Sequence, residues 1–60
     1  MKVLTLIELM RMTRIELTDL SGRITNALGG YPPESEDYAN ARVNLRNIRR
    51  LLARRDLAPP

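Results

Sequence analysis

Apolar residues in the second half of the chain recur at the spacing of an α-helix. They follow one another at steps of three and four, which places them on one helical face. The residues are Tyr38, Ala41, Leu45, Ile48 and Leu52. Ser35 precedes this stretch as an N-cap, and Glu36 and Asp37 place negative charge near the positive end of the helix dipole. The pattern predicts an amphipathic helix over about residues 36–55.

The first half carries a second apolar stripe, with steps of four and three in regular alternation. Its members are Leu6, Met10, Thr13, Leu17, Leu20, Ile24 and Ala27. A period of 3.5 residues favours coiled-coil-like packing. Thr5 followed three positions later by Glu8 is the signature of a capping box. These features predict one unbroken helix over about residues 6–28.

The segment between the two stripes has the composition of a turn. Gly29-Gly30 predicts a C-terminal cap with one glycine in the left-handed conformation. The following Tyr31-Pro32-Pro33 cannot continue a helix, because proline lacks the backbone donor. Ala58-Pro59-Pro60 likewise predicts a frayed tail over residues 56–60. We therefore expect a single domain over residues 1–60 whose two helices fold back on each other.

The resulting fold class is all-α: an antiparallel two-helix hairpin with one packing seam. The seam is expected to contain Leu6, Met10, Leu17, Leu20, Ile24, Ala41, Leu45, Ile48 and Leu52. Two helices bury one side each, and a chain of 60 residues buries little surface by itself. Met12, Ile15, Val43 and Leu51 fall outside the seam. We therefore expect a homodimer in which two hairpins form a four-helix bundle.

Composition narrows the chemistry. The chain has no histidine and no cysteine, which leaves no ordinary zinc site and none of the usual nucleophile–base pairs. We therefore expect no enzyme activity, cofactor, metal or small-molecule substrate. No stretch approaches the roughly 20 apolar residues of a membrane span, so we expect a cytoplasmic protein that does not interact with membranes.

The second predicted helix is strongly cationic. Its candidate nucleic-acid-binding residues are Arg42, Arg46, Arg49, Arg50 and Arg54. Guanidinium groups bind phosphate in bidentate fashion, and Asn40, Asn44 and Asn47 can add hydrogen bonds. The alternative interpretation is a solvated helix face, because arginine is a good helix former and suits the negative end of the dipole. The net charge of +3 is compatible with both.

Several stretches together resemble a known group of proteins. They are Met1-Lys2-x-Leu4-Thr5, Thr13-Arg14-x-Glu16-Leu17, Asn44-Leu45-Arg46-Asn47-Ile48-Arg49-Arg50 and Ala53-Arg54-Arg55. They look like a family of short uncharacterised proteobacterial helical proteins encoded among plasmid and conjugative-element genes. The resemblance implies an accessory role connected with mobile DNA, and it supplies no catalytic residue. We expect a non-enzymatic, self-associating helical interaction module; the alternative is a nucleic-acid-binding protein that uses the second-helix arginines.

Overall fold

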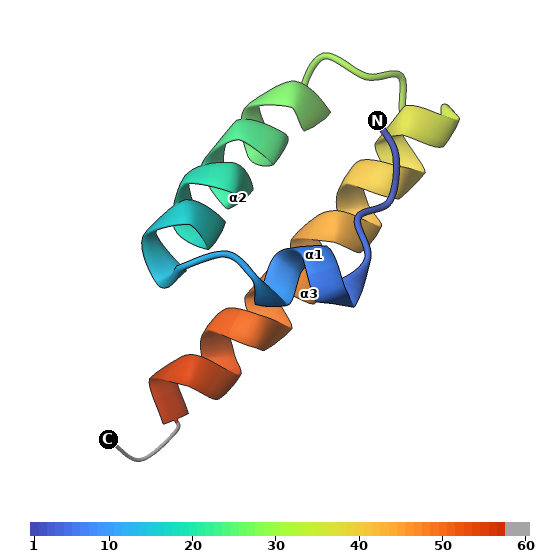
Figure 1. Cartoon of the computed structure of the whole chain (residues 1–60). Coiled ribbons are helices and arrows are strands. Elements are labelled where there is room, and N and C mark those ends of the chain that lie inside the picture. Colours follow the sequence, from blue (N-terminus) through green and yellow to red (C-terminus); the bar gives the residue numbers. More distant parts are fainter. Residues whose placement is uncertain (58–60) are drawn as a thin grey trace.

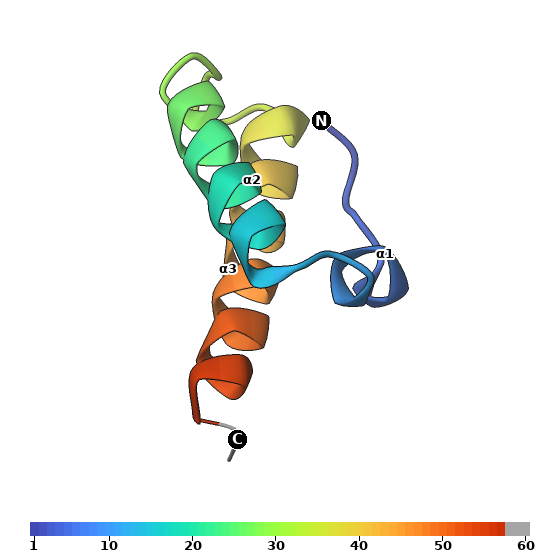
Figure 2. The ribbon, with the colours of Figure 1, turned by 60° about the vertical axis from the view of Figure 1, so that its left-hand side comes forward.

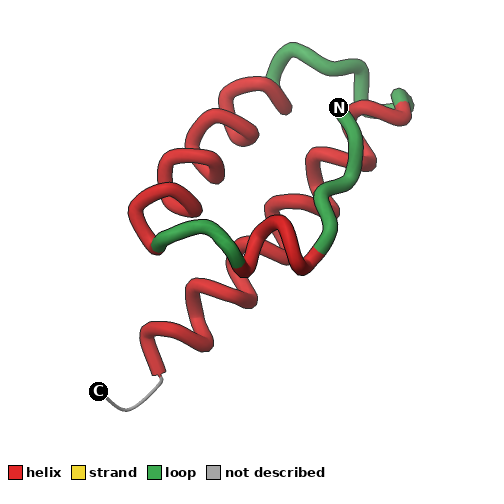
Figure 3. Tube along the Cα trace, in the orientation of Figure 1, coloured by secondary structure: helices red, strands yellow, loops and turns green. Residues whose placement is uncertain are grey.

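The protein folds into three helices. The computed structural model describes the backbone of residues 1–57 and the side chains of residues 1–54. Within this range the chain contains α1 (Leu6–Met10), α2 (Arg14–Leu28) and α3 (Glu36–Leu57), and no strand. α2 and α3 lie side by side and run in opposite directions, with α1 on another side of α3 (Figures 1 and 2). Loops separate the three helices and precede α1 (Figure 3). The predicted all-α class is confirmed.

The predicted continuous helix over residues 6–28 is wrong, because the chain breaks at Thr13. Thr13 is extended, with φ −71° and ψ 165°. Its hydroxyl accepts a hydrogen bond from Glu16 N–H at 3.1 Å, and its own N–H donates to Glu16 Oε1 at 2.9 Å. This reciprocal pair is a capping box. It begins a new helix where the heptad pattern had placed a seam residue.

The two helix starts share one local sequence, Thr-x-Ile-Glu-Leu, at residues 5–9 and 13–17. Thr5 caps α1 as expected, accepting the Glu8 N–H at 3.1 Å. Among the described residues, however, the return bond from Thr5 N–H to the Glu8 carboxylate is not formed. The last residue of each copy, Leu9 or Leu17, is fully buried. The repeated sequence thus gives each helix a cap and an apolar anchor.

The core joins all three helices. Its buried apolar side chains are Leu9, Leu17, Ile24, Ala41, Leu45 and Ile48. Leu20 and Leu52 are half-buried at its edge, as are Met12 and Leu51. The expected seam positions of Leu6 and Met10 are corrected: their side chains are 56% and 62% exposed. The break before α2 turns α1 so that Leu9 occupies the core instead.

Both ends of the α2–α3 connection also differ in part from expectation. Ser35 caps α3 as predicted, since its Oγ accepts the Tyr38 N–H at 3.1 Å. The left-handed glycine cap is wrong, because no glycine in the described chain has positive φ. Instead, Gly30 N–H donates to Ala27 O at 2.9 Å and Tyr31 N–H to Leu28 O at 3.3 Å. These tighter i→i−3 bonds close the helix end without a left-handed residue.

The C-terminal boundary lies later than expected. α3 continues to Leu57, so the predicted frayed tail over residues 56–60 is wrong for residues 56–57. A helix can run up to the residue before a proline, and Pro59 therefore permits this extension. The predicted tail residues 58–60 lie outside the described part of the chain.

The segment that precedes α1 is held along α3 by two asparagines. Asn44 is fully buried. Its Oδ1 accepts the Leu4 N–H at 2.8 Å, and its Nδ2 donates to Lys2 O at 2.9 Å. One turn earlier, Asn40 Nδ2 donates to Met1 O at 2.8 Å. The Met1 amino group also forms an ion pair with Asp37. These bonds bring the N-terminal segment beside α3 (Figure 1).

We predict that Asn44→Ala destabilises the protein by about 1–3 kcal/mol, because it removes two hydrogen bonds of a buried amide and leaves the partly buried Leu4 N–H and Lys2 carbonyl without these partners. Asn47→Ala is the matched control: Asn47 lies three residues later on α3 and makes no side-chain hydrogen bond among the described residues. Urea unfolding measures both variants, and hydrogen exchange at Leu4 reports the segment directly. Equal stabilities for the two variants would contradict this role of Asn44.

The capping box at Thr13 also predicts a pH effect. Hydrogen bonds from the Thr13 backbone and side chain lower the pKa of Glu16 from its ordinary value of 4.5. The stability contributed by this ionisation is therefore complete above about pH 4.5 and is lost as the pH falls through the lowered folded pKa. Glu16→Gln keeps an acceptor for the Thr13 N–H but does not ionise. Urea unfolding between neutral and acidic pH should show a shallower acid-side loss in this variant than in the parent; identical profiles would refute the assignment.

Candidate functional site

Two surface features stand out, and they lie on different elements. The first is the arginine ridge, which we define as Arg42, Arg46, Arg49, Arg50 and Arg54 on α3. The second is the α1 patch, which we define as Val3, Leu6, Ile7, Met10 and Ile15. The sequence predicted the residues of the ridge. It placed Leu6 and Met10 of the patch in the core.

The arginine ridge is exposed along its whole length. All five side chains are exposed, and none of them takes part in an ion pair among the described residues. Two acidic residues of α2 have other partners, since Glu16 closes the capping box and Asp19 Oδ2 lies 3.0 Å from Arg23 Nε. Five neighbouring cations with no ion-pair partner among the described side chains produce a positive field that attracts anions.

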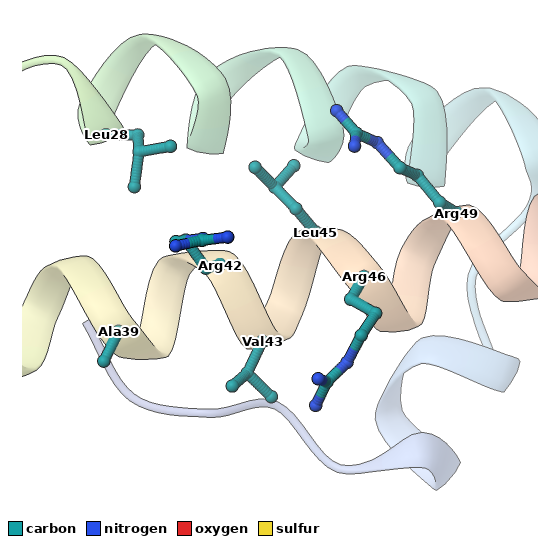
Figure 4. Close-up of a pocket in the computed structure, with 7 residues that line it drawn as sticks. All are labelled: Leu28, Ala39, Arg42, Val43, Leu45, Arg46 and Arg49. Carbon is teal, nitrogen blue, oxygen red and sulfur yellow. The ribbon is translucent and has the colours of Figure 1, made fainter.

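An open groove of about 550 Å³ runs beside the ridge, between α3 and the end of α2. Its lining consists of Leu28, Ala39, Arg42, Val43, Leu45, Arg46 and Arg49. Leu45 and Arg49 point toward α2, whereas Val43 and Arg46 project from the other edge of α3 (Figure 4). The groove therefore combines an apolar floor with cationic edges. It suits an elongated anionic partner better than an enclosed small molecule.

The asparagines that the sequence assigned to nucleic-acid contacts have different roles. Asn40 and Asn44 use their side-chain amides to hold the N-terminal segment. Asn44 is completely buried, so it cannot reach an external ligand. Asn47 is half-buried. Because the bonding partners are about 40 positions away in the sequence, no local pattern indicates this role.

The α1 patch concentrates the exposed apolar surface of the molecule at one end of the sequence. Every large apolar side chain that the described structure leaves exposed belongs to it, from Val3 at 44% to Ile15 at 81%. α1 has five residues and directs only Leu9 into the core. Its other apolar side chains are left facing outward. Exposed apolar side chains on one short helix and the residues that flank it provide surface for a contact with another molecule.

The charges around the α1 patch are balanced. Residues 1–19 contain three basic side chains, Lys2, Arg11 and Arg14, and three acidic ones, Glu8, Glu16 and Asp19. Two copies of this surface can therefore approach without net repulsion. Two arginine ridges cannot, because each carries five positive charges. The α1 patch is therefore suited to contact with a second copy, and the arginine ridge to contact with an anion.

Other classes of site find little support in the described residues. They contain no group of three or more His, Cys, Asp or Glu side chains placed to hold a metal ion. None of their helices is long and apolar enough to cross a membrane. Gly22 has no atom within 4 Å of where a Cβ would lie. It is a surface glycine in α2.

No protein-family model, curated protein or solved structure matches this chain. The assignment of function therefore depends on the arginine ridge and the α1 patch.

Proposed function

We propose that the protein is a small, non-enzymatic interaction module that self-associates through the α1 patch. The observation that carries this proposal is the confinement of all exposed large apolar side chains, within the described structure, to residues 3–15. Two observations favour a second copy of the chain as the molecule that covers the α1 patch. Only six apolar side chains of the described residues are buried completely or nearly so, and the ionic side chains of residues 1–19 sum to zero charge.

A homodimer with twofold symmetry uses the same patch on both copies. In the proposed assembly the α1 patches meet, and the two α2–α3 pairs together make a four-helix bundle. Covering these side chains adds apolar burial that a domain of this size needs. We propose that the protein is cytoplasmic. The resemblance of the chain to proteins encoded by plasmids and conjugative elements supports an accessory role connected with mobile DNA.

Self-association is tested with the double variant Ile7→Glu and Ile15→Glu. Both residues lie in the first turn of a helix, where an acidic side chain is tolerated, and both are exposed, so the fold should persist. We expect sedimentation equilibrium to show a dimer for the parent chain at micromolar concentration and a helical monomer for the variant. Asn26→Glu, on the exposed surface of α2, is the control and should remain dimeric. A parent chain that stays monomeric, or a double variant that stays dimeric, would overturn the proposal.

A second candidate function is binding of a nucleic-acid backbone. The observation that favours it is the arginine ridge, whose five exposed guanidinium groups have no ion-pair partner in the described structure. A solvated helix face would be expected to intersperse charges of both signs. On α3, all acidic side chains in the described range lie in the first turn, at Glu36 and Asp37.

The backbone-binding candidate predicts a steep salt dependence. Affinity for duplex DNA should fall with rising salt, because each phosphate contact releases a counterion. Arg42→Ala and Arg49→Ala should each reduce the slope of log K against log salt by about one. Arg23→Ala is the matched control, since Arg23 is an exposed arginine of α2 that pairs with Asp19. Fluorescence anisotropy provides the measurement, and slopes unaffected by the ridge variants would exclude the ridge as the binding surface.

A further inference from the structure

The arginine ridge has an internal order that goes beyond its total charge. Ala39, Val43, Arg46, Arg50 and Ala53 follow one another at steps of four, three, four and three. This spacing places them on one line along α3. It lies opposite the buried stripe of Ala41, Leu45 and Ile48. Along this line two exposed arginines, Arg46 and Arg50, follow Ala39 and the half-buried Val43, and Ala53 comes after them.

The other arginines flank this line. Arg42 and Arg49, seven residues apart, lie on its α2 side, where they line the groove together with Leu45. Arg54 follows Arg50 by four residues, a rotation of about 400°, so it is offset by about 40° toward the side away from α2. The exposed face therefore has two central arginines, with further arginines on both sides. This arrangement fits a target that carries two parallel rows of negative charge.

We propose that α3 lies in the major groove of duplex DNA, with Arg46 and Arg50 directed at base edges and Arg42, Arg49 and Arg54 at the flanking phosphates. This inference rests on the second candidate function, because it requires that the ridge bind a nucleic-acid backbone. It adds the type of nucleic acid, the groove, and the division of roles among the arginines.

The dimensions of the major groove are suited to α3. The major groove of B-DNA is about 12 Å wide and admits an α-helix, with the phosphates of the two strands along its edges. Ala39, Val43 and Ala53 have small side chains, so the helix can approach closely. From Arg42 to Arg54 the helix rises about 18 Å. The C-terminal end of α3 also extends past both α1 and α2 (Figures 1 and 2).

The chemistry of the guanidinium group supports the base contacts proposed for Arg46 and Arg50. The arginine fork is suited to the O6 and N7 acceptors of guanine in the major groove. The major groove of an RNA duplex is deep and narrow, and a helix cannot enter it in the same way. Glu36 and Asp37 at the start of α3 repel phosphate. They therefore limit the contact to the part of the helix that begins near Ala39.

The test compares three probes with the full-length protein: a pool of random-sequence DNA duplexes, the same pool with 7-deazaguanine in place of guanine, and an RNA duplex pool. 7-Deazaguanine removes the N7 acceptor and leaves the phosphates unchanged. We expect the protein to prefer ordinary DNA by about tenfold over each of the other probes, the order of one bidentate base contact. In Arg46→Lys the charge remains but the fork is lost, so the preference over 7-deazaguanine should shrink. Arg42→Lys, a flanking variant, should keep that preference.

The outcomes separate this inference from the function on which it rests. Salt-dependent binding of equal strength to all three probes would overturn the major-groove arrangement and leave backbone binding intact. If none of the three probes shows salt-dependent binding, both the major-groove arrangement and backbone binding are overturned. A preference for ordinary DNA that Arg42→Lys and Arg46→Lys reduce equally would overturn the division between central and flanking arginines. A preference for ordinary DNA that Arg46→Lys loses and Arg42→Lys keeps supports the division between central and flanking arginines.

Discussion

The buried amide of Asn44 is the interaction on which the arrangement of the chain depends. It donates to Lys2 O and accepts from Leu4 N–H, two backbone groups on the same edge of an extended segment. A residue in a neighbouring parallel strand would make the same pair of bonds. A side chain on a helix thereby satisfies the backbone of a segment that belongs to no secondary structure. Without these bonds the buried amide would carry a desolvation cost.

This contact determines where α1 lies. The N-terminal segment is fixed beside α3, so the five-residue helix that follows it begins next to the core, and Leu9 enters the core. A helix of that length is not stable by itself, because the first turn costs more conformational entropy than its few hydrogen bonds return. α1 therefore exists through its cap at Thr5, its anchor at Leu9, and the attachment of the preceding residues. The exposure of Leu6, Ile7 and Met10 is a consequence of that position.

α3 connects these features to both proposed functions. One side of the helix packs against α2 through Leu45 and Ile48, and another side holds the N-terminal segment through Asn40 and Asn44. The arc left uncovered carries the arginine ridge. Self-association through α1 and anion binding through α3 use different residues and opposite physical preferences, because one surface is apolar with balanced charge and the other is cationic. A dimer formed through the α1 patches would therefore still present its ridges.

The features that depend on local chemistry could be predicted from the sequence. The stripe from Tyr38 to Leu52, the Ser35 cap and the Gly-Pro turn defined α3, the end of α2 and the all-α class, because periodicity, capping and proline act over a few residues. The start of α2 had a local signal as well: Thr13 and Glu16 repeat the pattern of Thr5 and Glu8. The regular heptad spacing concealed it, because that spacing gave Thr13 a second interpretation as part of a continuous helix. Tertiary contacts alone establish that Leu9 is buried while Leu6 and Met10 are exposed, and that Asn44 binds the chain's own backbone rather than an external partner. Both results depend on contacts between residues about 40 positions apart, for which helical periodicity contains no information.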